Sequence, residues 1–317
     1  MKVVKPIPIT PANYRIYSTD PSGYVNAYGS VEYSAVTAYV VGNRVIVDSL
    51  QSEFECIQNT TGNAPVVAGN AWWVRVGASN AWKLFDGVVS DQMVGYTSGP
   101  QLAQAMVIHL VGLGHFSTVA VLNCSAANIV CLFRSPDVTI TSQYLQSVDT
   151  TPVIDAWTYC FADLNVQTSF VFDGVDGWGT GTDAELTLYI NNPEDSTDPV
   201  LVGEIVVGNS VDLGLCHAGS KMELIDYSRK TTDAFGSVVL VQRPYSFNSS
   251  FEIEVDSTRR NRVQSLISEL RATSCVWFPT VGDANDGIVT YGFQTLFSIT
   301  YETPSRAYAS LEIEGLV

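Results

Sequence analysis

Short runs that alternate apolar and polar residues recur along most of this chain, separated by Gly, Asn, Asp, Ser and Pro. The run 251–255 is typical, because Phe251, Ile253 and Val255 alternate with two glutamates. A period of two places alternate side chains on opposite faces of a β-strand. Many short strands with frequent turn signals are typical of sandwiches and barrels. The pattern therefore predicts a mainly β protein.

One segment has helical spacing instead. Its apolar residues recur at intervals of three and four: Val263, Leu266, Ile267 and Leu270. This spacing predicts one amphipathic helix over about residues 257–272, with Asp256 or Ser257 as N-cap. The opposite side of the helix is basic, with Arg259, Arg260, Arg262 and Arg271. That side is either a solvated face or a contact with an acidic neighbouring subunit.

Changes in composition divide the chain into four parts. Residues 1–36 are turn-rich and are expected to form an N-terminal arm. Residues 37–78 form a small aromatic module, predicted to have three strands. Residues 79–199 are expected to form a jelly-roll-like β-sandwich, ending at the turn-rich stretch 191–199. Residues 200–317 form a second β domain that carries the helix.

Composition and charge exclude several classes of protein and partner. Hydrophobic residues make up 46% of the 317 positions and charged residues 15%, which excludes a disordered chain. The 32 acidic and 16 basic residues give a net charge of −16. Nucleic-acid and anionic-membrane binding both favour clustered Lys and Arg, so we expect neither partner.

We expect neither a membrane-spanning segment nor a leader. Its start lacks a continuous apolar stretch followed by a small-residue cleavage site. The longest run without charged residues, 92–133, is interrupted by Gly, Pro, Gln, His and Asn. No apolar span of about 20 residues remains, so we expect a soluble product made in a cytoplasm.

Cysteine and histidine are too sparse for a metal centre. Six cysteines include no C-x-x-C pair, and only three histidines are present. A zinc site needs closely spaced soft ligands, so free and mostly buried thiols are expected, with no cofactor. One acidic loop could bind calcium through Asp173, Asp176 and Asp183, or be a plain turn in which Trp178 is an exposed contact residue.

The sequence contains none of the common catalytic motifs. Gly-x-Ser-x-Gly, the phosphate-binding Gly-rich loop and His-Glu-x-x-His are all absent. A glycosidase needs only two suitably spaced carboxylates, so 32 acidic residues leave that reaction open. The expectation is nevertheless a protein that is not an enzyme.

Residues 38–77 resemble the small chitin- and cellulose-binding modules attached to bacterial chitinases. The residues that carry the resemblance are Tyr39, Gly42 to Val45, Phe54, Gly62 to Pro65 and Trp73. The sequence departs from the pattern at Ser52 and Glu53, where a Gly is usual. In such modules an exposed aromatic ring stacks on a sugar, so the resemblance implies carbohydrate contact by Tyr39, Trp72 and Trp73. Trp72 and Trp73 are adjacent, so in a strand one would enter the core and the other would bind sugar or pack on the sandwich.

Three motifs extend the resemblance to the C-terminus: residues 79–92, 225–243 and 291–317. Together with the module they resemble a family of tailed-phage structural proteins. The resemblance implies a non-enzymatic virion protein of the tail tip or baseplate, similar in role to distal tail proteins. Such a protein would form a homo-oligomeric ring, contact the tail tube and hub, and reach host surface polysaccharide. The alternatives are a free carbohydrate-binding protein and an accessory or catalytic subunit of a polysaccharide hydrolase, such as a tail depolymerase.

Overall fold

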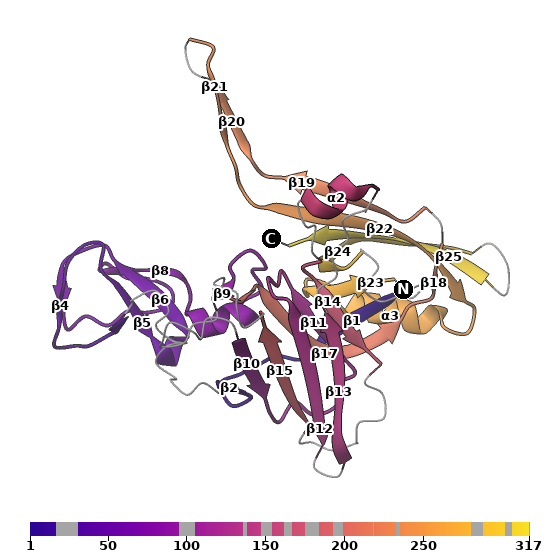
Figure 1. The fold of residues 1–317 in the computed structure, drawn as a ribbon, viewed down its shortest axis with the longest axis horizontal. Helices are drawn as coiled ribbons and strands as arrows, with labels where there is room; N and C mark the ends of the chain where they lie inside the picture. Colours follow the sequence, from indigo (N-terminus) through magenta and orange to yellow (C-terminus); the bar gives the residue numbers. More distant parts are fainter. Residues whose placement is uncertain are drawn as a thin grey trace.

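The fold of this chain is mainly β, as the alternating pattern predicted. A computed structural model describes these residues: 1–16, 31–94, 105–135, 138–146, 154–161, 167–174, 184–192, 199–217, 219–232, 235–279, 288–301 and 306–316. Two large antiparallel sheets, a small lobe and a projecting two-stranded ribbon make up this part of the chain (Figure 1).

The larger sheet has ten strands in the order β14-β11-β17-β1-β23-β24-β25-β22-β18, with β19 also paired to β22. Its strands are β1 (Lys2–Pro6), β11 (Thr118–Leu122), β14 (Phe170–Asp173), β17 (Glu204–Asp212), β18 (Leu215–Cys216), β19 (Lys221–Asp226), β22 (Tyr245–Asp256), β23 (Cys275–Phe278), β24 (Thr290–Tyr301) and β25 (Arg306–Gly315). Neighbouring strands come from both halves of the sequence, so the sheet joins them into one body.

The first strand, β1, lies in the middle of this sheet. It pairs antiparallel with β17 on one side and with β23 on the other. Val3 and Val4 are fully buried on opposite faces, and Lys2 forms an ion pair of 2.5 Å with Asp173. The expected N-terminal arm of residues 1–36 therefore begins with a central strand, which connects the two predicted β domains.

A second sheet forms a sandwich with one end of the first. Its order is β13-β12-β15-β10-β2. Its strands are β2 (Tyr14–Ile16), β10 (Ala105–Leu110), β12 (Asn128–Ser135), β13 (Val138–Gln146) and β15 (Glu185–Asn191). Apolar residues from both sheets, including Ile108, Phe133 and Phe170, form one buried core. Ile205 and Val207 belong to that core, so a boundary at residue 199 does not separate the two predicted domains.

In the sandwich region β9 (Met93–Val94) also pairs with β16 (Leu201–Val202), and Ser125 forms an isolated antiparallel bridge with Leu201. At the far end of the large sheet, helix α3 (Arg260–Glu269) covers one face. Val263, Ile267 and Leu270 share a core with residues of β22 and β25. The helix starts later than predicted, because Asp256 Oδ1 accepts a hydrogen bond from the Thr258 N–H (2.8 Å) and so forms a turn. The N-cap is Arg259, without a side-chain bond, rather than Asp256 or Ser257.

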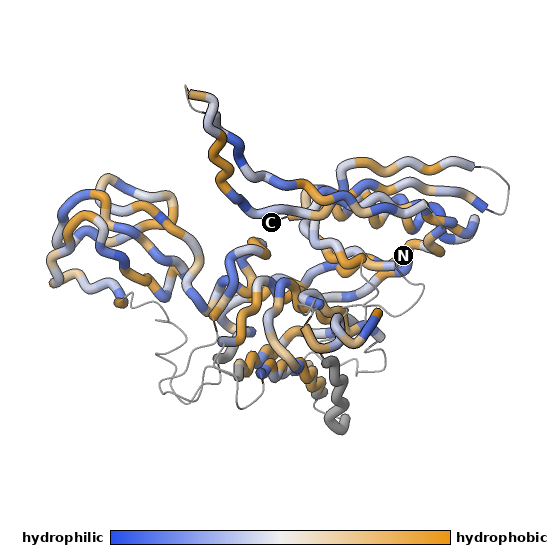
Figure 2. The backbone as a smooth tube through the Cα atoms, turned by 45° about the horizontal axis from the view of Figure 1, so that its top comes forward, coloured by the Kyte–Doolittle hydropathy of each residue, from blue (hydrophilic) through white to orange (hydrophobic). Residues whose placement is uncertain are grey.

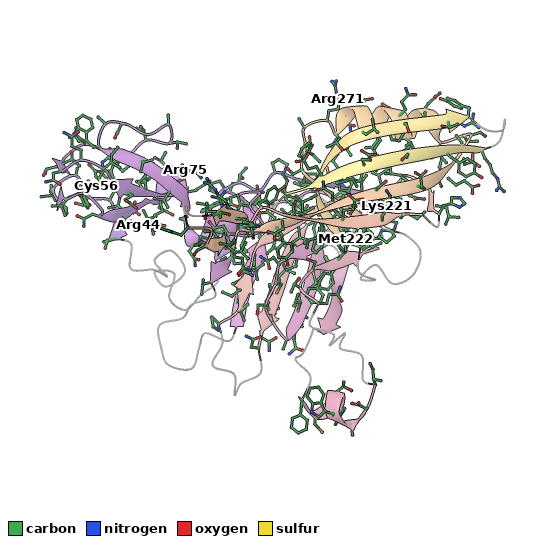
Figure 3. All side chains as sticks on the ribbon, turned by 90° about the horizontal axis from the view of Figure 1, so that it is seen from above. Arg44, Cys56, Arg75, Lys221, Met222 and Arg271 are labelled. Carbon is green, nitrogen blue, oxygen red and sulfur yellow. The ribbon has the colours of Figure 1, made fainter. Side chains whose placement is uncertain are left out.

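The small lobe contains the predicted aromatic module. Its elements are β3 (Val31–Glu32), β4 (Ala38–Tyr39), β5 (Arg44–Val47), η1 (Asp48–Leu50), β6 (Ser52–Cys56), β7 (Thr60–Thr61) and β8 (Trp73–Ala78). The next element, η2 (Asn80–Phe85), places Ala81 and Leu84 in the core of the sandwich. The three predicted strands β5, β6 and β8 gain a fourth, β3, which pairs parallel to β5. The lobe thus begins by residue 31 rather than 37. Figure 3 shows it beside the body, with Arg44, Cys56 and Arg75 labelled.

A two-stranded ribbon projects from the large sheet. Strands β19 and β22 leave the sheet as a pair and continue as β20 (Arg229–Thr232) and β21 (Val238–Val241). Figure 1 shows the ribbon extending away from both sheets. We call residues 227–244 the ribbon. A short helix, α2 (Ala156–Phe161), is the remaining element.

All six cysteines lie in described segments and none forms a disulfide. Cys56, Cys124, Cys131 and Cys275 are buried. The expectation of free and mostly buried thiols is therefore confirmed. Among the described residues, no helix combines the length and apolar character needed to cross a bilayer.

Candidate functional site

Two of the three predicted sugar-binding residues lie in the core of the small lobe. Trp73 is fully buried, and its indole N–H donates a hydrogen bond of 2.7 Å to the Asn63 carbonyl. Tyr39 is 8% exposed, and its ring meets the Trp73 ring edge-on at 5.2 Å. A ring enclosed in this way has no open face for a sugar, so the prediction of sugar stacking is corrected for Tyr39 and Trp73. Both residues instead supply the apolar core that so small a fold needs.

Trp72 is the predicted residue that keeps part of its surface accessible. It is half-buried and packs against the edge of the lobe core. A groove of about 960 Å³ lies along the lobe, and its lining mixes apolar residues with charged ones such as Glu32, Arg44 and Glu53. Tyr39 borders this groove, whereas Trp72 and Trp73 do not. The structure therefore does not bring the three predicted residues together into one exposed aromatic site.

The ribbon exposes apolar side chains on both of its faces. On one face of the ribbon, Arg229 lies opposite Val241 and Thr231 lies opposite Val239. On the other face, Lys230 lies opposite Leu240 and Thr232 lies opposite Val238. All four apolar residues of β21 are exposed, Leu240 by 73%. Figure 2 shows hydrophobic β21 beside hydrophilic β20 along the ribbon. An isolated two-stranded ribbon is at best marginally stable in water, and exposed contiguous apolar surface marks interaction sites.

Exposed apolar residues continue from the ribbon onto its stem. Met222 and Leu224 of β19 and Tyr245 and Phe247 of β22 share one side of the stem. The Tyr245 and Phe247 rings meet edge-on at 5.4 Å. Figure 3 places Met222 beside Lys221, where β19 joins the sheet. The ribbon and stem thus form one continuous surface that has no covering element within the described part of the chain.

The ribbon also differs from the rest of the chain in charge. Residues 227–244 contain three basic residues and one acidic residue, a net charge of +2. The remaining chain has 13 basic and 31 acidic residues, a net charge of −18. Arg229, Lys230 and Arg243 are all exposed, and none has an ion-pair partner among the described residues. The ribbon is therefore a basic, apolar extension of an acidic body.

A buried carboxyl group joins the small lobe's linker to the large sheet. Glu204 is 5% exposed and accepts a hydrogen bond of 3.0 Å from the Gly87 N–H. Burial, with a smaller contribution from the nearby Asp86 carboxyl, raises the pKa of Glu204 to about 9. Burial also raises the pKa of Asp86 to about 6 and that of Tyr291 to about 12. Glu204 is thus protonated at neutral pH.

These groups are the kind that serve as acids or bases in enzymes. A groove of about 550 Å³ lies nearby, lined by residues that include Leu122, Arg243, Phe247 and Tyr291. Neither Glu204 nor Asp86 lines that groove. The geometry therefore assigns the carboxyl pair to the junction between the lobe's linker and the sheet.

The remaining predicted sites are structural where the chain is described. Asp173 is held by Lys2 and by the Thr118 hydroxyl at 2.8 Å, while Asp176, Trp178 and Asp183 lie outside the described residues. At the start of α3, the N-cap Arg259 pairs with Asp212 at 2.9 Å, and Arg260 lies over the Tyr301 ring at 5.2 Å.

Sequence reasoning missed both the ribbon and Glu204. The available sign of the ribbon was an unusual hairpin, in which the apolar run 238–241 follows a segment of two basic residues and two threonines, 229–232. Glu204 stands directly before the apolar run 205–207, and a carboxyl group at the edge of such a run was the available sign of burial.

The described residues hold no group of three or more His, Cys, Asp or Glu side chains placed to bind a metal ion. No model of a known protein family matches the chain, and no curated protein matches it either.

Proposed function

We propose that this chain is a structural subunit of a bacteriophage tail tip or baseplate, which assembles into a ring with copies of itself. The observation that carries the proposal is the ribbon, with exposed apolar residues on both faces. A ribbon of this kind is stabilised when a neighbouring molecule covers it. The resemblance to tailed-phage structural proteins supports the same function.

The proposed assembly is closed. The ribbon projects from the body, and in this proposal it contacts a different surface on the next copy rather than its own equivalent. Such head-to-tail interfaces close into rings when the rotation between copies allows it. The net charge of −16 keeps the separate subunits soluble before they assemble.

In this proposal the small lobe is peripheral and contacts the host surface polysaccharide through Trp72. Its support is the partial exposure of Trp72, together with the resemblance to sugar-binding modules. Partners in the virion are further copies of the chain, the tail tube and the hub.

The test is the mass of the purified full chain in solution. We expect size-exclusion chromatography with light scattering to show an oligomer of defined size, and negative-stain images to show rings. A chain that stays monomeric over the micromolar range and releases reducing sugar from a polysaccharide would instead support the hydrolase alternative.

A further inference from the structure

The large sheet has an outer face that matches the ribbon in both charge and apolar character. On β22 and β25, Phe251 and Leu311 point toward α3, so their neighbours Glu252 and Glu312 point to the opposite side. Glu314 shares that side, because it lies two residues beyond Glu312. Glu312 and Glu314 are exposed, and Glu252 is half-buried.

Apolar residues lie among these carboxylates. Leu296 of β24 is opposite Glu312, and Phe293 is opposite Glu314. Leu296 is 51% exposed. We call Glu252, Phe293, Leu296, Glu312 and Glu314 the acidic face. Within the described segments, none of its three carboxylates takes part in an ion pair, whereas the neighbouring Glu254 pairs with His217 and Arg306.

We infer that the ribbon of one copy lies on the acidic face of a second copy, an inference that rests on the ring-forming function proposed above. Either side of the ribbon presents one cation, Arg229 or Lys230, together with two apolar residues of β21. The acidic face presents carboxylates around Leu296. Cations and carboxylates brought together in this way select a partner and its orientation.

The contact must form between copies. Figure 1 shows the ribbon extending away from the sheet that carries the acidic face, so a chain does not cover its own face. One ribbon and one acidic face per copy give each subunit one donor and one acceptor surface. This is the arrangement that a head-to-tail ring requires.

A charge exchange tests the inference. The ribbon variant carries Arg229→Glu and Lys230→Glu, and the face variant carries Glu312→Lys and Glu314→Lys. Each variant alone places like charges at the contact, so we expect at least a tenfold weaker self-association by mass photometry. Mixing the two variants pairs opposite charges again at every contact, and we expect the mixture to regain the oligomer.

The control variant carries Arg262→Glu and Arg271→Glu on the exposed side of α3, which lower the net charge by as much as the ribbon variant does. It should assemble like the native chain, and circular dichroism should show that all variants are folded. This inference would be overturned if the ribbon variant or the face variant assembled like the native chain, or if a mixture of the two folded variants stayed dissociated. Neither result would contradict the proposed ring-forming function. A native chain that never oligomerises would overturn the proposed function as well.

Discussion

Lys230 lies directly opposite Leu240 in the ribbon, so a cation and an exposed leucine share one face of an element that no described part of the chain covers. Arg229 and Val241 repeat the arrangement on the other face. Such a surface adds little to the stability of a folded monomer. In an assembly it would add stability through burial of apolar area and through charge pairing.

Replacing the apolar residues of the ribbon should abolish assembly without unfolding the subunit. In the double variant Val239→Thr and Leu240→Thr, both faces lose apolar area, while threonine still favours the strand. Because these side chains are exposed, the free energy of unfolding should change by less than about 0.5 kcal/mol. Light scattering and thermal unfolding measure the two effects. Val36→Thr, at an exposed valine of the small lobe, is the control, and an intact oligomer in the double variant would contradict the prediction.

The two adjacent tryptophans should respond differently to truncation. Trp73→Ala removes a fully buried ring and its hydrogen bond, so it should destabilise the small lobe by about 3–5 kcal/mol. Trp72→Ala should cost much less, because that side chain is only half-buried. Limited proteolysis and tryptophan fluorescence would follow unfolding of the lobe. Equal losses in the two variants would show that the lobe depends on both rings.

Trp72 also provides the test of sugar contact. We expect Trp72→Ala to reduce retention of the folded chain on chitin or on host cell-wall polysaccharide in a pull-down. Val67→Ala, at another exposed apolar position of the lobe, is the matched control. Unchanged retention of the Trp72 variant, or no retention of the native chain, would limit the lobe to a structural or docking role.

The buried Glu204 should make stability fall as pH rises. Its folded-state pKa of about 9 lies above the ordinary value of 4.5, so the folded chain holds a proton that the unfolded chain has released. Its contribution is complete below pH 4.5 and declines toward pH 9, with a slope of up to about 1.4 kcal/mol per pH unit. Asp86 adds a similar decline between 3.8 and about 6.

Glu204→Gln removes the ionisable proton but keeps the shape of the side chain. We expect the variant to be more stable than the native chain at pH 8 and similar to it at pH 4. Denaturant unfolding at a series of pH values would measure the difference. A native and a variant curve that run parallel from pH 6 to 9 would refute the assignment of that slope to Glu204.

Gly208 should be essential for the insertion of β1. A Cβ atom at this position would lie 2.0 Å from the Lys5 carbonyl oxygen, so Gly208→Ala forces β1 and β17 apart. We expect a loss of about 1–3 kcal/mol, together with faster proteolysis near the N-terminus. Gly77→Ala is the control, since its nearest atom would be 3.7 Å away. Equal stability of the two variants would show that β1 contributes little.

Much of the local structure follows from side-chain spacing in the sequence. The period of two predicted β22 and its buried Phe251, and the helical spacing of Val263, Ile267 and Leu270 predicted α3. These patterns are readable because each depends only on residues a few positions apart. The start of α3 was misplaced because Asp256 forms a local turn with Thr258 that competes with helix capping.

The surroundings of each strand were decided by the tertiary structure alone. The apolar runs 118–122 and 238–241 look alike in sequence, yet the first is buried on both faces and the second is exposed on both. The difference arises because β11 lies between β14 and β17, with packed residues on each side, whereas β21 has only β20 beside it. The burial of a strand depends on which distant segments pair and pack with it, and the spacing of residues within the strand does not specify those segments.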